Sequence, residues 1–206
     1  MRTLREEAER FDRRAGRYDR WFSQWWFFRP VHRTMLDALR LVRGERFLEV
    51  GCGTGNLTLA AAAASGSAVG VDPSPKMVEV GRAKGVPQGA EVAFLTGAAE
   101  ALPLPDESFH VAASSISMHH WVDVDVGLRE LHRVVRPGGR IVVADLAPRG
   151  AGKALAAVLA LGDRDHMSFD QHDLGRRVRD AGFAHVRVLR RGLHSRLVGF
   201  IAADRP

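Results

Sequence analysis

The feature that most constrains the fold is a run of three glycines at alternate positions, Gly51-Cys52-Gly53-Thr54-Gly55. It follows a short apolar segment, 46–50, and precedes an alanine-rich segment, 56–64. Alternate glycines let the backbone turn tightly and approach a ligand, because no Cβ atom stands in the way. In open α/β sheets such a loop lies at the carboxyl ends of the strands, where ligands bind. The pattern therefore predicts a ligand site at the first strand–helix turn of a parallel sheet.

The rest of the chain alternates between segments typical of strands and segments with helical periodicity. The expected strands are 46–50, 68–71, 91–95, 111–115, 140–144, 184–189 and 197–202, and the expected helices between them are 56–64, 75–84, 123–135 and 171–181. This order predicts the α/β class: a Rossmann-like three-layer sandwich with a seven-stranded, mostly parallel sheet. The last two strands, joined by the short segment 191–194, should form an antiparallel hairpin at one edge.

The N-terminal region has a different pattern. Residues 1–28 carry apolar side chains at steps of three and four, which predicts one amphipathic helix, and 31–42 predicts a second. We interpret 1–43 as a helical lid segment and 44–206 as the ligand-binding domain. Because 206 residues fit one ordinary domain, both parts should form one structural domain overall.

The composition limits the cellular location and the binding partners that we expect for this chain. The absence of a run of about 18 apolar residues predicts no transmembrane helix, and the charged N-terminus is unlike a signal peptide. With Cys52 as the single cysteine, we expect no disulfide framework, no metal site and a cytoplasmic location. The formal net charge of +6, together with the aromatic residues of 21–28, leaves a peripheral membrane contact open. The chain could be a monomer or a homodimer.

An acidic residue, Asp72, ends the second expected strand, about 20 residues beyond the first glycine. In dinucleotide sites a carboxylate at this place accepts hydrogen bonds from the ribose hydroxyls. A role as helix cap explains Asp72 less well, because Ser74 is better placed to cap the next helix. The dinucleotide fingerprint requires glycine or alanine where this chain has Asn56, which disfavours a dehydrogenase.

Four segments together resemble a known family. Residues 47–56 resemble the first motif of class I S-adenosylmethionine (SAM)-dependent methyltransferases. Residues 95–105 are similar to the "GDAEALPF" segment of the quinone-biosynthesis (methyltransferase type 11) family, 131–140 to its "RVLKPGG" turn, and 11–21 to its "FD…A…YD" opening. The resemblance implies an enzyme that binds SAM, releases S-adenosylhomocysteine and methylates an O, N or C nucleophile of a small aromatic or lipophilic molecule.

The resemblance also implies which residues bind the cofactor. They are Tyr18, Glu49, Gly51, Cys52, Gly53, Gly55, Asn56, Asp72, Pro73, Met77, Ala98, Ala99, Glu100, Ser114 and Ser115. In this scheme Glu49 orients the loop and the ammonium end of SAM, Asp72 binds the ribose, and Tyr18 closes over the cofactor. The chain departs from the family at Ala98, where an aspartate usually takes the adenine amino group.

Two adjacent histidines, His119 and His120, follow the fourth expected strand and are the candidates for a catalytic base. Methyl transfer needs a base only if the nucleophile must lose a proton, so a packing role for either histidine stays open. His166 and His172, in the acidic segment 163–173, could contact the substrate or bind a metal, although His and Asp at such close spacing in a loop are more often solvated.

Other function classes are less well supported by the residues. A nucleic-acid or protein methyltransferase is compatible with the basic charge. However, Ser115-Ile116-Ser117-Met118 lacks the Asn/Asp-Pro-Pro-Tyr/Phe motif of base-amino methylases, which argues against a nucleic acid partner. The alanine at Ala98 leaves open a SAM-binding protein without activity. A small-molecule methyltransferase is the favoured interpretation.

Overall fold

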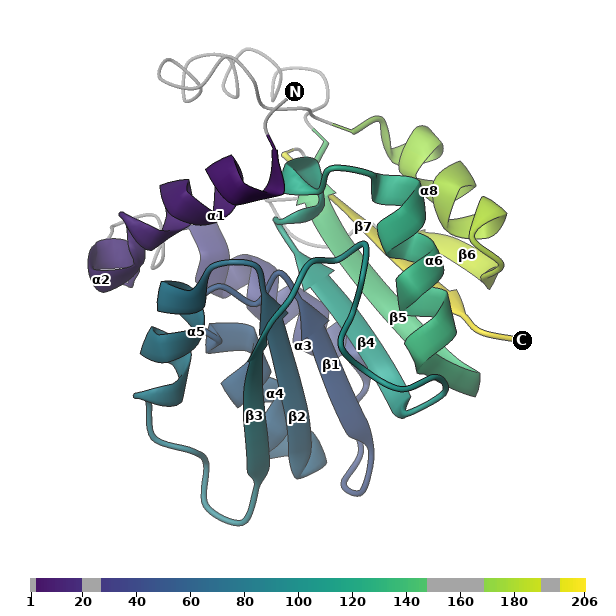
Figure 1. The fold of residues 1–206 in the computed structure, drawn as a ribbon. Helices are drawn as coiled ribbons and strands as arrows, with labels where there is room; N and C mark the ends of the chain where they lie inside the picture. The colour runs from purple at the N-terminus through teal and green to yellow at the C-terminus, as the bar shows by residue number, and fades with distance from the viewer. Residues whose placement is uncertain (1–2, 20–26, 148–168, 190–196) are drawn as a thin grey trace.

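A computed structural model describes residues 3–19, 27–147, 169–189 and 197–206 (Figure 1). Seven strands form one sheet in the order β3-β2-β1-β4-β5-β7-β6, and β7 pairs antiparallel with both of its neighbours. The strands are β1 (Arg46–Val50), β2 (Ser67–Asp72), β3 (Glu91–Thr96), β4 (Phe109–Ser115), β5 (Val135–Leu146), β6 (Ala184–Leu189) and β7 (Val198–Asp204). The predicted mostly parallel sheet with an antiparallel edge hairpin is confirmed.

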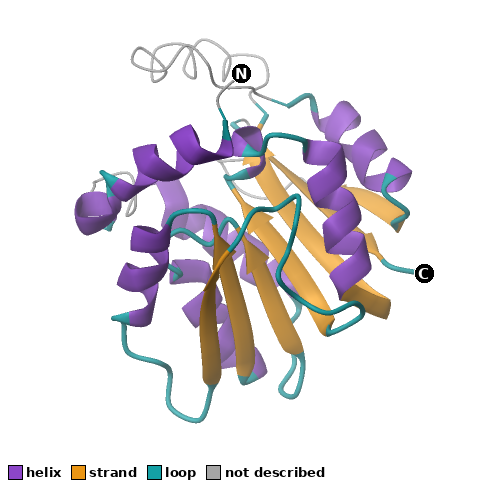
Figure 2. Cartoon of the chain, in the orientation of Figure 1, coloured by secondary structure: helices purple, strands orange, loops and turns teal. Residues whose placement is uncertain are grey.

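Helices cover both faces of the sheet, which completes the three layers (Figure 2). They are α1 (Leu4–Asp12), α2 (Ala15–Tyr18), α3 (Arg29–Leu39), α4 (Asn56–Ser65), α5 (Pro75–Arg82), α6 (Val124–Val134) and α8 (Gln171–Asp180), with a short 3₁₀ helix, η2 (Met118–His120). Helices α3, α4 and α5 pack on one face, and α6 and α8 pack on the other. Helices α1 and α2 instead lie across the carboxyl ends of the parallel strands (Figure 1).

Successive side chains of the central strands point to opposite faces of the sheet. Because helices cover each face, both sets of side chains are buried. Leu48 of β1 packs with Leu128 of α6, whereas its neighbour Phe47 packs with Met35 of α3 and Leu57 of α4. All five side chains are fully buried. Since α3 contributes to this core, the predicted division at residue 43 does not coincide with a boundary in the packing.

The N-terminal region differs from the prediction of one continuous helix over 1–28. Helix α1 ends at Asp12, and a tight turn precedes α2, where the Arg14 amide donates to the Phe11 carbonyl (2.9 Å). The turn follows the residue whose carboxylate, that of Asp12, accepts hydrogen bonds at the N-terminus of α5. The Asp12 side chain therefore faces α5. The aromatic residues Trp21, Phe22, Trp25 and Trp26 lie outside the described residues.

Strand β5 is longer than the predicted strand 140–144, because the turn Pro137-Gly138-Gly139 falls inside it. The chain end pairs with this turn: the Gly138 amide donates to the Arg205 carbonyl (2.9 Å), and the Arg205 amide donates to the Gly139 carbonyl (2.8 Å). The turn therefore extends the β-ladder rather than ending it. The predicted hairpin connection 191–194 lies outside the described residues.

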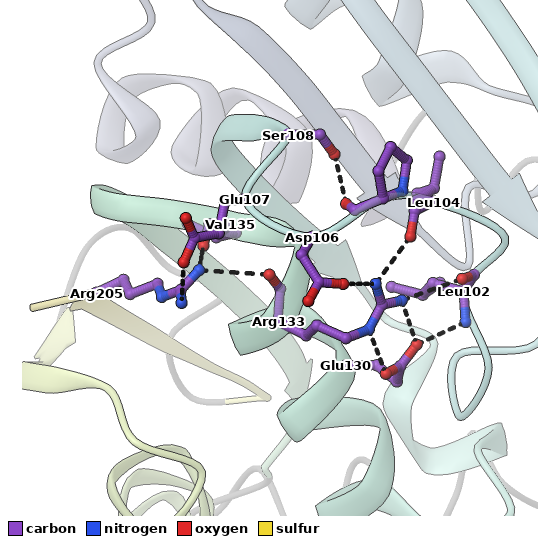
Figure 3. Close-up of polar contacts among 10 residues, drawn as sticks. Leu102, Leu104, Asp106, Glu107, Ser108, Glu130, Arg133, Val135 and Arg205 are labelled. Carbon is purple, nitrogen blue, oxygen red and sulfur yellow. Dashed lines mark hydrogen bonds and ion pairs between the residues drawn. The ribbon is translucent and has the colours of Figure 1, made fainter.

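Arg133 of α6 fixes the loop between β3 and β4 (Figure 3). Its guanidinium donates to the Leu102 and Leu104 carbonyls (3.1 and 2.8 Å) and to the carboxylates of Asp106 and Glu130 (2.6 and 2.7 Å). Such charge-assisted, multidentate bonds are the strong ones among protein hydrogen bonds. This loop follows directly on residues 97–100, so the arginine of the "RVLKPGG"-like turn helps to position the segment that resembles the adenine-binding motif.

In the parts of the chain that the structure describes, no helix is both long enough and apolar enough to cross a bilayer.

Replacing Val111 by alanine tests the central position of β4. Val111 is fully buried, so the loss of two methyl groups and the cavity left behind should lower the free energy of unfolding by about 2–3 kcal/mol. The same change at Val188, which is 37% exposed on the edge strand β6, should cost about 0.5 kcal/mol or less. Urea denaturation measures both, and equal losses would contradict the assignment of β4 to the core.

Candidate active site

Residues at the carboxyl ends of β1, β2 and β4 line a cavity together with residues of α1 and α2. Thirteen of the residues predicted from the sequence line it. They are Tyr18, Glu49, Gly51, Cys52, Gly53, Asn56, Asp72, Pro73, Met77, Ala99, Glu100, Ser115 and His120. Segments distant in the sequence thus converge on one space, as expected for a loop site of an open α/β sheet.

Four predicted residues are not among those that line the cavity, each because its side chain or backbone is engaged elsewhere. The Ser114 hydroxyl bonds to that of Ser117 (2.8 Å), and His119 turns toward Asp145. Ala98 closes a tight turn by accepting from the Ala101 amide (3.3 Å). The fourth residue, Gly55, packs against the ring of Phe94 behind the loop.

Eleven further residues line the cavity that sequence reasoning did not select. They are Leu4, Glu7, Phe11, Phe28, His32, Val50, Thr54, Gly97, Ile116, Ser117 and Trp121. Val50, Thr54 and Gly97 stand inside the motifs already recognised, so their position could have been inferred. Leu4, Glu7, Phe11 and His32 come from the N-terminal helices, where the periodicity does not show which side faces a ligand.

The glycine loop adopts conformations that other residues avoid. Gly51 and Gly55 have φ angles of +73° and +78°. A Cβ atom at Gly51 would lie 2.2 Å from Oγ of Ser117, and one at Gly55 would lie 2.3 Å from the ring of Phe94. Both distances are far below van der Waals contact. The alternate glycines are therefore required by the close approach of the loop to the segment after β4 and to β3.

Asp72 connects the loop to the start of α5. Its carboxylate accepts from the amides of Gly53 (2.8 Å) and Ser74 (2.9 Å), while the Ser74 hydroxyl caps α5 by accepting from the Met77 amide (3.1 Å). Asp72 is 7% exposed, and this burial raises the pKa of its carboxyl to about 6. The carboxylate lines the cavity and is available to further donors from a ligand.

Glu49 is a second buried carboxyl at the cavity wall. It accepts a hydrogen bond from the Thr58 hydroxyl of α4 (2.5 Å). Burial, reinforced by the nearby Asp72, raises the pKa of Glu49 to about 8. A cationic group brought into this cavity would therefore be attracted by Asp72 and would favour ionisation of Glu49.

Asp19 ties the N-terminal region to the glycine loop. Its carboxylate accepts from the Thr54 hydroxyl (2.7 Å) and the Asn56 side-chain amide (3.0 Å), and it pairs with the Lys84 ammonium (2.8 Å). These bonds explain the asparagine at a position where a dinucleotide loop has glycine. They also place the neighbouring Tyr18 ring against the loop, since a Cβ at Gly53 would lie 3.8 Å from Cε1 of Tyr18.

Asp12, at the end of α1, also links the N-terminal region to the rest of the domain. Its carboxylate accepts from the Ser74 hydroxyl (2.5 Å) and from the Lys76 amide (3.2 Å), both at the N-terminus of α5. A carboxylate there is also favoured by the helix dipole. We refer to residues 4–18, which form α1 and α2, as the N-terminal cover.

The two histidines have separate environments. His120 lines the cavity, with its Nδ1 atom 3.4 Å from Oε2 of Glu7 and its ring edge-on to Phe11, the ring centroids 5.0 Å apart. His119 lies behind it, with its Nδ1 atom 2.6 Å from Oδ1 of Asp145 and its side chain 3% exposed. The centroids of the two imidazoles are 3.9 Å apart. His120 is therefore the histidine of the pair that faces a ligand.

Comparisons with known proteins agree with this architecture. A family model described as a methyltransferase domain matches residues 48–143. A demethylmenaquinone methyltransferase of Mycobacterium sp. (strain KMS) is 33% identical over 229 residues, covering 98% of this chain and 94% of that protein. The chain belongs to this methyltransferase family. A demethylmenaquinone methyltransferase of Thermus thermophilus is 37% identical, although the match spans only 50% of its length.

Solved structures support the fold. A SAM-dependent methyltransferase from Thermotoga maritima superimposes with a TM-score of 0.75 at 24% identity, covering 95% of this chain and 98% of that one. A SAM-dependent methyltransferase from Aquifex aeolicus gives a TM-score of 0.69 at 21% identity, with coverage of 85% and 89%. Both neighbours are SAM-dependent methyltransferases by their names, and at these identities the likeness shows a shared fold. SAM is the ligand that the sequence resemblance leads us to expect in this cavity.

The cavity residues fit such a ligand. Besides the two carboxyls Glu49 and Asp72, the wall holds the Ser115 hydroxyl, which is buried and has no hydrogen-bond partner among the described residues. A buried polar group without a partner is costly, and a ligand group is one way to satisfy it. His166, predicted as a substrate contact, lies outside the described residues, and His172 lies in the first turn of α8, not in the cavity lining.

Replacing Asp19 by alanine should loosen the N-terminal cover without unfolding the sheet. Three donors on the loop and on the segment after α5 lose their acceptor, and we expect SAM affinity to fall roughly threefold to tenfold because the cover must then be ordered on binding. Titration calorimetry measures the affinity. Faster cleavage by trypsin after the exposed Arg13 and Arg14 would report the loosening independently.

The matched control is Asp37→Ala, an exposed aspartate on α3, which should change neither property. Unchanged affinity and unchanged proteolysis in Asp19→Ala would show that the cover is held by other contacts.

Proposed function

We propose that the protein transfers the methyl group of SAM to an O, N or C nucleophile of a small aromatic or lipophilic molecule. The observation that carries the proposal is that one cavity holds two buried carboxyls on the sheet side and a histidine, His120, under an apolar cover. The carboxyls suit the polar groups of SAM, and the cover suits an acceptor that is kept away from water.

The sheet side of the cavity suits the cofactor. Asp72 would accept hydrogen bonds from the ribose hydroxyls, and Glu49 would face the ammonium group of the methionine part. The backbone of Gly51 and Gly53 would lie against the same part, and Tyr18 would close over it. Bound SAM supplies an electrophilic methyl group on a sulfonium and leaves as S-adenosylhomocysteine.

The cover side suits a flat, lipophilic acceptor. Apolar side chains from α1, from the residue before α3 and from the segment after β4 line it, namely Leu4, Phe11, Phe28, Ile116 and Trp121. The relatives named demethylmenaquinone methyltransferase and ubiquinone/menaquinone biosynthesis C-methyltransferase act, by their names, on quinone-type molecules. These features favour a quinol or another hydroxylated aromatic ring as the acceptor of this chain.

His120 would accept the proton that such an acceptor loses. As the methyl group moves from sulfur to the nucleophile, the C–S electron pair stays on sulfur, and the acceptor proton passes to the imidazole. The enzyme mainly holds the nucleophile in line with the methyl group and excludes water. His119, held by Asp145, would support the His120 ring from behind.

We further propose a cytoplasmic setting, which the single cysteine Cys52 suits, and a monomeric or homodimeric enzyme with no need of a metal or nucleic acid partner.

The direct test is a methylation assay with a panel of short-chain demethylnaphthoquinols, phenols and amines, in which S-adenosylhomocysteine and the methylated product are both measured. His120→Ala should lower the rate by about 10²–10⁴-fold and leave SAM affinity unchanged, because it removes a base and no cofactor contact. His185→Ala is the control, since His185 is 78% exposed on β6. Loss of SAM affinity in His120→Ala would contradict the assignment of His120 as the base.

The ribose role of Asp72 predicts a pH dependence of SAM binding. Because burial raises the pKa of Asp72 to about 6, its carboxylate is ionised at pH 7.5 and becomes protonated below pH 6. Protonation removes the charged acceptor, so SAM affinity should fall by up to about tenfold per pH unit below pH 6. Titration calorimetry at several pH values measures this.

Asp72→Asn should bind SAM about 10- to 100-fold more weakly at pH 7.5 and lose this dependence on pH. A variant with the affinity of the natural protein would refute the ribose assignment. NAD in place of SAM serves as a negative control for the cofactor.

A further inference from the structure

The face of α1 that lines the cavity carries a carboxylate among apolar residues. Leu4, Glu7 and Phe11 follow one another at helical spacing and all line the cavity. Glu7 is the buried residue of α1, with 7% of its surface exposed, although glutamate is normally solvated. Burying a carboxylate costs free energy unless charged or hydrogen-bonding groups face it, so its neighbours indicate its role.

Glu7 and Phe11 of α1 both contact His120. Oε2 of Glu7 lies 3.4 Å from Nδ1 of His120 and 3.6 Å from Nη1 of Arg10. The Phe11 ring meets the imidazole edge-on, at an interplanar angle of 80°. Among the residues that the structure describes, Glu7 and Arg10 of α1 and the adjacent His119 are charged or titratable groups near His120.

The position of α1 is fixed independently of this pair. Asp12 at the end of the helix bonds to Ser74 and Lys76 of the α5 N-terminus, and a capping box of Thr3 and Glu6 orders the first turn. A carboxylate on α1 is thereby held at a defined distance from a ring on η2, more than a hundred residues later in the chain.

We propose that Glu7 is the positioning residue of the base: its carboxylate, 3.4 Å from Nδ1 of His120, electrostatically favours the tautomer that carries its hydrogen on Nδ1 and leaves Nε2 basic, and it stabilises the imidazolium formed by proton uptake. The use of His120 as a base rests on the proposed function. In the transfer, the acceptor O–H or N–H bond breaks, its proton goes to Nε2, and the hydrogen on Nδ1 stays beside the Glu7 carboxylate. The N-terminal cover thus supplies part of the proton-accepting device, which is complete only when α1 lies over the cavity.

The test uses the whole protein with ¹⁵N-labelled histidine, whose ring nitrogens report protonation and tautomer by NMR, with His120→Asn to assign the signals. In the natural protein we expect the Nδ1–H tautomer for His120. Glu7→Gln keeps the shape of the side chain but removes the charge, so the pKa of His120 should fall by about one unit. Glu9→Gln, the same change on the exposed side of α1, should leave the pKa and the tautomer unchanged.

An unchanged pKa and tautomer of His120 in Glu7→Gln, or the same shift in Glu9→Gln, would overturn the inference. With an acceptor from the panel, Glu7→Gln should lower kcat by about tenfold or more and move the acidic limb of its pH profile to lower pH, with the KM for SAM unchanged. A merely structural role would change KM or stability instead. If the NMR shift occurs but the natural protein methylates no acceptor, the pairing stands and the proposed function fails.

Discussion

The close approach of the glycine loop to the neighbouring strands is the constraint on which the rest of the site depends. Because Gly51 and Gly55 have no Cβ atom, the loop can lie against Ser117 and Phe94 in a left-handed conformation. That position brings the Gly53 amide to Asp72 and presents Thr54 to Asp19. The cofactor side and the N-terminal cover are thus both oriented by one short backbone segment.

The cavity is rich in acidic residues although the net charge of the whole chain is positive. The protein carries a formal net charge of +6, yet its cavity is lined by the carboxyl groups of Glu7, Glu49, Asp72 and Glu100. A ligand with a sulfonium and an ammonium is attracted by such a wall, whereas its product has lost the sulfonium charge. If SAM is the ligand, as proposed, its positive charge favours its binding over retention of S-adenosylhomocysteine, and it would favour ionisation of Glu49, whose pKa burial raises to about 8.

The sheet and the residues of its strand ends that line the cavity could be predicted from the sequence, because both rest on local chemistry. Alternate glycines after a strand, an acidic residue at the end of the second strand and alternating periodicities are each typical of few structures. Glu7 could not be recognised in the same way, since a glutamate in a charged amphipathic helix looks solvated until the helix is docked. The break after Asp12 could not be predicted for a similar reason: its carboxylate accepts from Ser74, the N-cap residue of α5, which is 62 residues away in the sequence.

The residues on the two sides of the cavity come from different parts of the fold. Residues that face the cofactor stand on strand ends and on a loop of the rigid sheet, where small displacements are costly. The apolar residues proposed to face the acceptor come from α1, from the residue before α3 and from the segment after β4. His120 lies where the two parts meet, on a turn after β4 but in contact with Glu7 and Phe11 of α1. If His120 is the base, as proposed, it has its neighbours Glu7 and Phe11 only when the cover lies over the cavity, so docking of the cover would both exclude water from the acceptor and complete the group that takes its proton.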